Sequence, residues 1–546
     1  MIPVILCLAI GSITAGRSQD LVKNDGLTGP LHKAHLGEVT FMAKPVPLAD
    51  LGEKDLLKTF ELREAGDLNI RVFMENSLIN YLHRLAPGKS VEELSAAGNY
   101  QFTFIVNGTV TYTENLPPGA GGINGKITQT TYRVPLMSTT AEDSWGRFLW
   151  NRFLMSGGED AFTAGMHELK IEIRPYIKSP DLKTGEIIAS GRIVLKVVKP
   201  EVDESKIAPQ TILPGSGWPV SADPFDREKI RDLKRKIAQR DFKDITSLIV
   251  IKDGKLLIEE YFNGVGRTSL HNTRSVGKSF ASALTGLALR DGYIKNLDRT
   301  LGESYDLGAF AHPSPKKSSV TLRDLLTMSS AFGGSDQDMD SPGNEEKMYP
   351  TADWVKFALD LPMDEAKENG KQWDYFTAGV VLLGDILDKV VPGGLERYAD
   401  QELFKPLGIT KYEWQYTPQK VVNTAGGLAL TALDLAKFGQ LYKNGGLWDG
   451  RPVLPKSWVE ATFHRYLKVP TRENTSYGLL FWNTTYRANG RPNETFFATG
   501  NGGSKIYVFT DQPLVVVVTA TAYGKSYAHP QVDKMMERYV LPAVVR

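Results

Sequence analysis

The chain has 546 residues, which is too long for a single hydrophobic core, so we expect two or more domains. Its formal net charge at pH 7 is +1, from 64 Lys and Arg against 63 Asp and Glu. Proteins that bind nucleic acid normally carry a basic surplus that displaces counterions from phosphates, so this balance excludes nucleic acid as a partner.

The first 16 residues, MIPVILCLAIGSITAG, form a short apolar run that ends in small residues. This run suits the core of a signal peptide but is shorter than the roughly 20 apolar residues of a membrane span. We predict a signal peptide over 1–16 and an exported, periplasmic or extracellular protein with no membrane span after its removal. A buried first strand and a mis-assigned start are the alternatives. The only cysteine, Cys7, lies in this run, so the mature protein would lack disulfides, zinc thiolates and a cysteine nucleophile.

Strand patterns with a period of two residues dominate from 38 to 198. Residues 100–113 alternate apolar and polar side chains around an Asn-Gly pair at 107–108, which is typical of a tight hairpin. The same alternation recurs over 167–177 and 191–198. We therefore predict an antiparallel β-sandwich-like domain, and its residues show no catalytic constellation. Its role stays open between binding of glycan or cell wall and covering of an active site.

Residues 199–225 follow neither the helical nor the strand period. This stretch contains five prolines and two glycines, so we predict a linker. The second domain then spans 226–546.

The second domain mixes strand and helix patterns. Hairpins are predicted over 245–262, with a turn at Asp253-Gly254, and over 505–521. Helical patterns follow the first hairpin at about 275–291, 322–330, 352–360, 378–390 and 433–443, and a closing helix covers 531–545. Strands at both ends with helices between them predict an α/β (α+β) domain, in which an antiparallel sheet has flanking helices and an α-rich insertion.

The stretch HNTRSVGKSFAS, residues 271–282, resembles two common motifs only in part. A phosphate-binding loop needs glycine five residues before Gly277, where this chain has Asn272. A Gly-x-Ser-x-Gly elbow around Ser275 needs glycine where this chain has Thr273. Both interpretations therefore fail, and the chain also lacks the HExxH metal motif.

A serine–lysine pair is the remaining interpretation of this stretch. Ser275 and Lys278 lie three residues apart at the start of a predicted helix, so they share a face. The helix start supplies unpaired N–H groups for an oxyanion, and a partly desolvated lysine can help to deprotonate the hydroxyl. The spacing alone is weak support, because Ser-x-x-Lys also occurs at 314–317 in a predicted loop.

Other segments in a fixed order give this pair its context. About a hundred residues downstream of Ser275 lies WDYFTAGVVLLGDILDKV, and about 120 residues further lies FFATGNGGSKIYVF. Supporting stretches are 320–332, 426–458 and YGLLFW at 477–482. In this order, the segment from about 225 to 546 resembles the class C β-lactamase-related serine hydrolases, with their β-lactamase/transpeptidase-like fold. It looks most like the esterase and 6-aminohexanoate-dimer hydrolase-like branch.

The resemblance implies roles for individual residues. Ser275 would be the nucleophile, Lys278 its activating partner, and Tyr375 the general base of the family's Tyr-x-Asn motif. The asparagine of that motif is replaced here by Thr377, which lacks an amide.

The third family motif, usually Lys-Thr-Gly or His-Thr-Gly, is here Ala498-Thr499-Gly500. Alanine cannot supply the cation that commonly binds a substrate carboxylate, which disfavours β-lactamase and D,D-peptidase activity. Thr377, Thr499 and Gly500 are candidate substrate-binding residues. Asn501 is the first choice for the second oxyanion N–H, although the glycines that follow leave other choices open.

We therefore predict an exported serine hydrolase that cleaves a small-molecule ester or amide through an acyl-enzyme, with no metal or organic cofactor. One alternative is a β-lactamase or D-aminoacyl peptidase. Another is a catalytically inactive binding protein on the same fold. The sequence does not indicate the oligomeric state.

Overall fold

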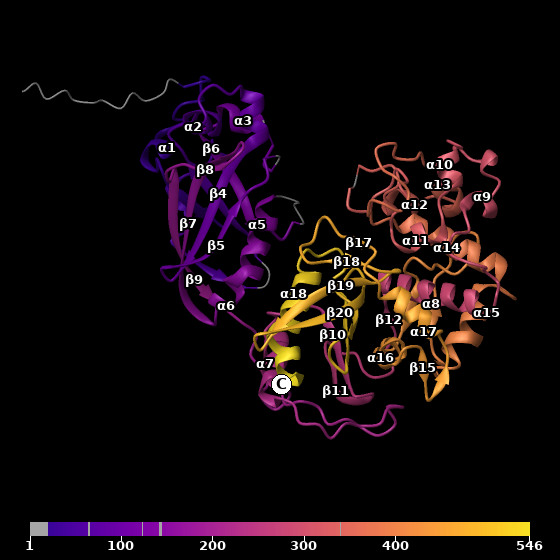
Figure 1. Cartoon of the computed structure of the whole chain (residues 1–546). Helices are drawn as coiled ribbons and strands as arrows, with labels where there is room; N and C mark the ends of the chain where they lie inside the picture. Colours follow the sequence, from indigo (N-terminus) through magenta and orange to yellow (C-terminus); the bar gives the residue numbers. More distant parts are fainter. Residues whose placement is uncertain are drawn as a thin grey trace, which may run out of the picture. The chain divides into compact units, whose positions relative to one another are not determined.

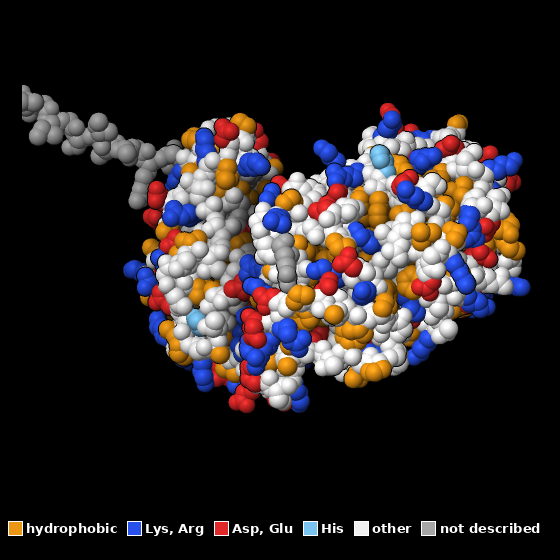
Figure 2. All heavy atoms as spheres, turned by 60° about the horizontal axis from the view of Figure 1, so that its bottom comes forward, with side chains coloured by type: hydrophobic (Ala, Val, Ile, Leu, Met, Phe, Trp, Pro, Cys, Tyr) orange, Lys and Arg blue, Asp and Glu red, His pale blue; other side chains and the backbone are white. Residues whose placement is uncertain are grey.

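The computed structural model describes residues 20–63, 66–118, 120–122, 124–140, 145–338 and 340–545. The chain forms two compact units, Met1–Pro200 and Glu201–Arg546 (Figure 1). The predicted signal peptide lies outside the described residues. None of the helices in the described ranges is long and apolar enough to cross a membrane. Figure 2 shows basic and acidic side chains interspersed on the face in view, as the near-zero net charge implies.

The first unit contains two β-sheets. A six-stranded sheet has the order β2-β9-β7-β4-β5 with β8 on β7, and a three-stranded sheet has the order β1-β3-β6. The strands are β1 (Val39–Met42), β2 (Thr59–Leu62), β3 (Leu68–Phe73), β4 (Gly98–Val106), β5 (Thr109–Asn115), β6 (Thr131–Met137), β7 (Gly165–Lys178), β8 (Leu182–Thr184) and β9 (Ala189–Val197). Their pairings are antiparallel except that between β2 and β9.

The helices of the first unit are short. They are α1 (Pro30–Ala34), α2 (Leu78–Leu85), α3 (Val91–Ala97), α4 (Asn124–Thr128), α5 (Trp145–Phe153) and α6 (Glu159–Ala161), with helical turns η1 (Glu53–Asp55) and η2 (Leu154–Gly158). The strand period did not predict them. Helix α5 helps to cover the larger sheet, because Phe153 stacks on Phe104 of β4 with ring centroids 4.5 Å apart. The layer over this sheet is therefore partly helical.

The β4–β5 hairpin forms where the sequence predicts it. Asn107 has φ 49° and Gly108 has φ 81°, the left-handed conformation that a two-residue hairpin turn requires at both positions. On the next strand, Leu169, Ile171 and Ile173 are fully buried, as the alternation of β7 predicts. Their shared face carries the core of this unit.

The second unit is built on an eight-stranded antiparallel sheet. Its order is β11-β10-β22-β21-β20-β19-β18-β17. The strands are β10 (Ile245–Lys252), β11 (Lys255–Tyr261), β17 (Leu467–Lys468), β18 (Ser476–Tyr477), β19 (Trp482–Ala488), β20 (Arg491–Thr499), β21 (Lys505–Phe509) and β22 (Leu514–Ala520). Because β10 pairs with β22, the two ends of the unit complete one sheet. The prediction of such a sheet is confirmed.

Helices and short strands fill the chain around this sheet. The helices are α7 (Arg227–Ala238), α8 (Gly277–Arg290), α9 (Leu301–Ser304), α10 (Pro315–Ser318), α11 (Leu322–Leu326), α12 (Glu345–Met348), α13 (Trp354–Asp360), α14 (Thr377–Val390), α15 (Leu395–Ala399), α16 (Ala432–Lys443), α17 (Lys456–Thr462), α18 (Ala528–Met535) and α19 (Leu541–Val544). Further turns and strands are η3 (Arg274–Val276), η4 (Leu307–Ala309), η5 (Asp400–Phe404), η6 (Met536–Val540), β12 (His271–Asn272), β13 (Glu413–Trp414), β14 (Leu428–Leu430), β15 (Leu447–Trp448) and β16 (Arg451–Pro452).

Helices lie on both faces of the large sheet. Helix α16 packs against β21 and β22, and a Cβ at its Gly439 would lie only 2.7 Å from Val515 and 2.8 Å from Ile506. Glycine therefore lets this helix approach the sheet closely. Figure 1 shows α8 and α16 on the opposite side of the sheet from α7 and α18.

The proline-rich stretch before α7 is an ordered part of the second unit. Trp218 is buried, with its ring edge-on to Trp448 at 5.6 Å. Leu256 of β11 donates its N–H to Pro219 and accepts the N–H of Ser221, each at 2.8 Å. This segment therefore borders the sheet edge rather than hanging free.

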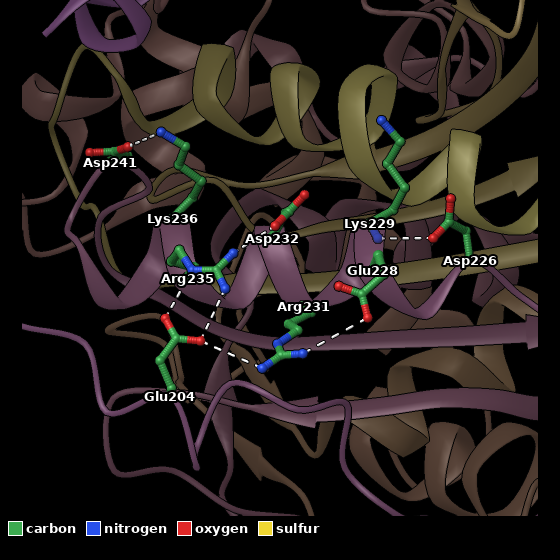
Figure 3. Close-up of polar contacts among 9 residues, drawn as sticks. All are labelled: Glu204, Asp226, Glu228, Lys229, Arg231, Asp232, Arg235, Lys236 and Asp241. Carbon is green, nitrogen blue, oxygen red and sulfur yellow. Dashed lines mark hydrogen bonds and ion pairs between the residues drawn. The ribbon is translucent and has the colours of Figure 1, made fainter. Parts of the chain in front are cut away.

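Helix α7 presents an exposed charged face. Figure 3 shows the polar contacts of this face, which involve Glu204, Asp226, Glu228, Lys229, Arg231, Asp232, Arg235, Lys236 and Asp241. Exposed ion pairs of this kind stabilise by about 0–1 kcal/mol each. The helix is held instead by its apolar face, where Ile230 and Leu233 are fully buried.

Candidate active site

Ser275 lies in the turn η3, directly before the buried helix α8. Strand β12 pairs with β14, and Thr273 donates from Oγ1 and from its N–H to the Leu428 carbonyl at 2.5 and 3.1 Å. Arg274 has φ 49°, a left-handed conformation that is unfavourable for a long side chain and that concentrates at functional sites. Strand β14 therefore holds the backbone that presents Ser275.

Lys278 lies one turn along the same helical segment and is 1% exposed. Its Nζ donates to Ser275 Oγ at 2.8 Å and to the Ala425 carbonyl at 2.6 Å. A buried lysine normally takes a carboxylate partner, but no carboxylate of the described chain forms an ion pair with Lys278. The amine is thus held directly against the serine hydroxyl.

Tyr375 is half-buried just before α14, and its ring centroid lies 5.1 Å from Lys278 Nζ. The ring packs against Trp482 at 5.7 Å and Trp373 at 6.1 Å. The structure therefore brings Ser275, Lys278 and Tyr375 into one cluster, although a hundred residues separate the serine from the tyrosine.

Thr377 begins α14 and is buried. Its N–H donates to Asp336 Oδ2 at 2.7 Å, while its Oγ1 is buried and has no hydrogen-bond partner within the described ranges. The hydroxyl is therefore hidden from solvent, and its predicted contact with substrate stays a prediction.

Asp336 is a residue of this site that sequence reasoning missed. Its Oδ1 accepts the Glu345 N–H at 2.8 Å, and its own N–H donates to the Tyr375 carbonyl at 2.8 Å. Burial and then the charge of Glu345 raise its pKa to about 6, against the opposing effects of the Thr377 hydrogen bond and Lys278. No motif marks Asp336, because its role depends on contacts with distant segments.

Gly500 of the third motif lies against the backbone of the nucleophile, Ser275. A Cβ at Gly500 would lie 2.2 Å from the Thr273 carbonyl oxygen and 3.1 Å from the Ser275 nitrogen. On another side, a Cβ at Gly426 would lie 3.4 Å from the same nitrogen. Two glycines thus pack against the peptide of Ser275. Gly426 falls in a stretch that supports the family resemblance, yet its packing role has no sequence signal of its own.

The other residues of the third motif sit around Gly500. Ala498 is buried and supplies no charge, and the Thr499 hydroxyl lies 3.3 Å from Nδ1 of His529. Asn501 is exposed, and its side-chain oxygen accepts the Gly524 N–H at 2.9 Å. Its own N–H makes no hydrogen bond with another described residue, as an oxyanion donor requires, and that role stays a prediction.

Two histidines lie near these segments, with His271 buried and His529 half-buried. Burial lowers the pKa of His271 to about 4, and its Nε2 has no partner in the described chain. Burial, followed by the charges of Lys505 and Arg472, lowers the pKa of His529 to about 3. Both imidazoles are therefore neutral at pH 7. Arg472 itself lies over the ring of Trp482 at 5.0 Å.

A comparison with known protein families assigns the part of the chain that contains these residues to one family. The family described as Beta-lactamase matches residues 234–534. No curated protein matches the chain significantly. The described residues contain no group of three or more His, Cys, Asp or Glu that could hold a metal ion.

Solved structures are similar to part of this chain at low identity. They include the octameric penicillin-binding protein homologue from Pyrococcus abyssi, at 20% identity over 57% of this chain and 76% of that chain, with a TM-score of 0.45. A penicillin-binding protein homologue from Caulobacter crescentus has 16% identity over 61% of this chain and 99% of that chain, with a TM-score of 0.46. The D-stereospecific amidohydrolase from Streptomyces sp. has 17% identity over 53% of this chain and 93% of that chain, with a TM-score of 0.42.

The family match covers more than half of the chain and includes the whole cluster around the nucleophile. It contains Ser275 with Lys278, Tyr375 and Gly500. The chain belongs to the beta-lactamase family of serine hydrolases.

Proposed function

We propose that this protein is an exported hydrolase that cleaves an ester or amide through an acyl-enzyme on Ser275. The observation that carries the proposal is the 2.8 Å contact between Lys278 Nζ and Ser275 Oγ. The amine has no carboxylate partner among the described residues, so its polar contacts there are the reacting hydroxyl and one carbonyl. That arrangement suits proton transfer rather than structural pairing.

The proposed reaction has two steps. Ser275 Oγ attacks the substrate carbonyl, its proton passes to the Lys278–Tyr375 pair, and the pair protonates the departing alcohol or amine. Water then attacks the acyl-enzyme, gives its proton to the same pair, and Ser275 recovers a proton as the acid product leaves. The Tyr375 ring centroid lies 5.1 Å from the lysine amine, which itself contacts the Ser275 hydroxyl at 2.8 Å.

The oxyanion of each step would be held by backbone N–H groups. The Ser275 N–H lies in the first turn of a helical segment, where backbone N–H groups have no intrahelical acceptor. The Asn501 N–H is the second proposed donor. Gly426 and Gly500 support this role because neither places a side chain against the Ser275 nitrogen.

The third motif favours substrates that have no carboxylate next to the scissile bond. Ala498 stands where the family usually has a cation, and no charge replaces it at that position. Neutral esters and amides are therefore the proposed substrates, ahead of β-lactams and D-aminoacyl peptides.

A labelling experiment tests the nucleophile. A fluorophosphonate should form one adduct on the wild-type protein and none on Ser275→Ala. Ser282→Ala is the matched control, because Ser282 is a buried serine of α8 whose hydroxyl has no partner among the described residues. Absence of an adduct and of turnover in the wild type would instead support an inactive binding protein.

A second measurement tests the substrate class. Hydrolysis of a nitrophenyl ester, an aminohexanoate amide and a chromogenic cephalosporin is compared under the same conditions. We expect the ester or the amide to have the highest kcat/KM. A cephalosporin turned over faster than both would contradict the proposed substrate class while leaving the nucleophile in place.

A further inference from the structure

The first unit contains a cavity of about 440 Å³, far from the catalytic residues in sequence. Three cations and three aromatic rings line it: Arg71, Lys126, Arg133, Tyr100, Tyr132 and Trp145. Asp25 is the one acid among its lining residues in the part of the chain that the structure describes. The volume falls within the range of about 300–1,000 Å³ that small-molecule sites occupy.

Arg71 is the most constrained of the cations. Its residue is 7% exposed, its Nη2 donates to the Val46 carbonyl at 3.1 Å, and its Nε is buried without a partner in the described ranges. It lies directly opposite Arg133 in the pairing of β3 with β6. Burial and the charge of Arg133 both lower the pKa of Arg71. A buried guanidinium facing a like charge is unfavourable unless an anion compensates it.

Lys126 brings a second buried cation to the same cavity. It is 7% exposed, and its Nζ donates to the Pro118 carbonyl at 2.8 Å. Burial lowers its pKa to about 8, so the amine is still mostly charged at pH 7. Neither Lys126 nor Arg71 forms an ion pair with a carboxylate of the described chain.

The aromatic rings form a continuous wall. Tyr100 and Tyr132 have ring centroids 4.8 Å apart, and Tyr132 and Trp145 are 6.4 Å apart. The Tyr132 hydroxyl is buried and has no hydrogen-bond partner among the residues described. The cavity thus combines an aromatic surface with cations and a polar group that has no partner among the described residues.

We propose that this cavity binds a small organic carboxylate with a flat apolar body. The carboxylate would lie between Arg71 and Lys126, because a guanidinium fork matches the two oxygens of a carboxylate. The apolar body would lie against Tyr100, Tyr132 and Trp145. This site lies outside the proposed catalytic cluster and does not depend on the activity of Ser275.

The test uses the full-length protein with 2-naphthoate as the probe and 2-naphthamide as its neutral counterpart. Ligand-observed NMR and thermal unfolding should both report binding of the naphthoate and weaker binding, by about tenfold or more, of the naphthamide. Equal binding of the two probes, or no binding of the naphthoate, would overturn the proposal. So would equally strong competition by inorganic phosphate, because the apolar body would then contribute nothing.

Variants locate the site. Arg71→Gln and Lys126→Met should each weaken naphthoate binding by about tenfold or more. Arg192→Gln is the matched control, because Arg192 is an exposed arginine on β9 outside the cavity. Lys126→Met keeps the length of the side chain and guards against misfolding of the Arg71 variant, with folding checked by circular dichroism. Unchanged affinity in a folded Lys126→Met protein would place the probe elsewhere and overturn the proposal.

Discussion

Two buried lysines of the second unit have opposite surroundings. Lys278 and Lys505 are each 1% exposed. Lys505 forms an ion pair with Asp533, whereas Lys278 contacts the Ser275 hydroxyl and the Ala425 carbonyl. An amine with a carboxylate partner is fixed as a structural cation, while an amine held against a hydroxyl can exchange a proton with it.

A third buried lysine limits this comparison. Lys317 is fully buried and donates to the carbonyls of Ala311 and Leu359 at 2.8 and 2.7 Å. Like Lys278, it has no carboxylate in ion-pair contact within the described chain. A missing carboxylate is thus not enough to mark a reactive lysine. The hydroxyl partner distinguishes Lys278.

The largest expected effect comes from exchanging each lysine for methionine. Lys278→Met should lower kcat for ester hydrolysis about a thousandfold, because it removes the group that moves the serine proton. Lys505→Met should leave Asp533 without its cation and cost about 2 kcal/mol of the free energy of unfolding. This figure is below that for a fully buried pair because Asp533 is partly exposed. Steady-state kinetics and urea unfolding measure the two effects.

The two variants control each other. Lys278→Met should unfold at a urea concentration close to that of the wild type, and Lys505→Met should keep most of its kcat. If Lys505→Met lost as much kcat as Lys278→Met while remaining folded, the distinction between a structural and a reactive lysine would be wrong.

The next expected effect is a pH dependence of the free energy of unfolding that arises from His271. His271 precedes the nucleophile and has a pKa of about 4 from burial alone, whereas its usual value is 6.5. Between pH 6.5 and 4 the unfolded chain takes up a proton that the folded chain does not, so stability falls as pH falls. The contribution is fully present above pH 6.5 and is worth about 3 kcal/mol. His271→Gln should flatten this part of the stability profile.

His529 extends the pH comparison to the region of Lys505. Its pKa of about 3 reflects burial together with the charges of Lys505 and Arg472. Lys505→Met should therefore raise the pKa of His529 and leave that of His271 unchanged, as measured by NMR titration.

The control for His271→Gln is a variant of the exposed His464. His464→Gln should leave the stability profile as it is. An equal flattening in both variants would contradict the assignment.

A smaller effect is expected where the third motif meets the nucleophile. Gly500→Ala places a Cβ 2.2 Å from the Thr273 carbonyl, so the backbone at Ser275 must shift. A displacement of about 1 Å at a reacting group can cost about a hundredfold in kcat/KM. Gly266→Ala is the matched control, because no atom of the described residues lies within 4 Å of a Cβ there. Normal kinetics for Gly500→Ala would show that the third motif does not position the serine.

Local patterns predicted much of the fold. Both ends of the large sheet, the turns at Asn107-Gly108 and Asp253-Gly254, and helix α14 follow from periodicity and turn chemistry that act over a few residues. The short helices of the first unit did not follow, since α5 is amphipathic over only nine residues between strands. Short apolar runs of this length do not distinguish helix from strand.

The candidate site was predicted less completely. Spaced motifs predicted Ser275, Lys278 and Tyr375, and in the structure Lys278 contacts both the Ser275 hydroxyl and the Tyr375 ring. Ala425 and Asp336 were not predicted. Ala425 contributes its backbone carbonyl, and the Asp336 carboxylate accepts the backbone N–H groups of other segments. Contacts of these kinds put little constraint on residue type or spacing, so they leave no pattern in a single sequence.

The smallest effect tests Asp336 as a positioning residue. Its two carboxylate oxygens accept the N–H groups of Thr377 and Glu345, and its N–H holds the Tyr375 carbonyl. Asp336→Asn turns one acceptor into a donor that faces an N–H group. We expect kcat to fall about tenfold, the effect of one lost hydrogen bond to a charged group.

The pH profile separates this role from a general loss of structure. Because burial raises the Asp336 pKa to about 6, the wild-type carboxylate gains a proton as pH falls through that value. Wild-type kcat should then decline below about pH 6, and Asp336→Asn should lack this decline because it has no proton to gain. Asp338→Asn, two residues along the same loop, should keep both the rate and the profile of the wild type. A decline of the same size in Asp336→Asn would assign the titration to another group and leave Asp336 with only a packing role.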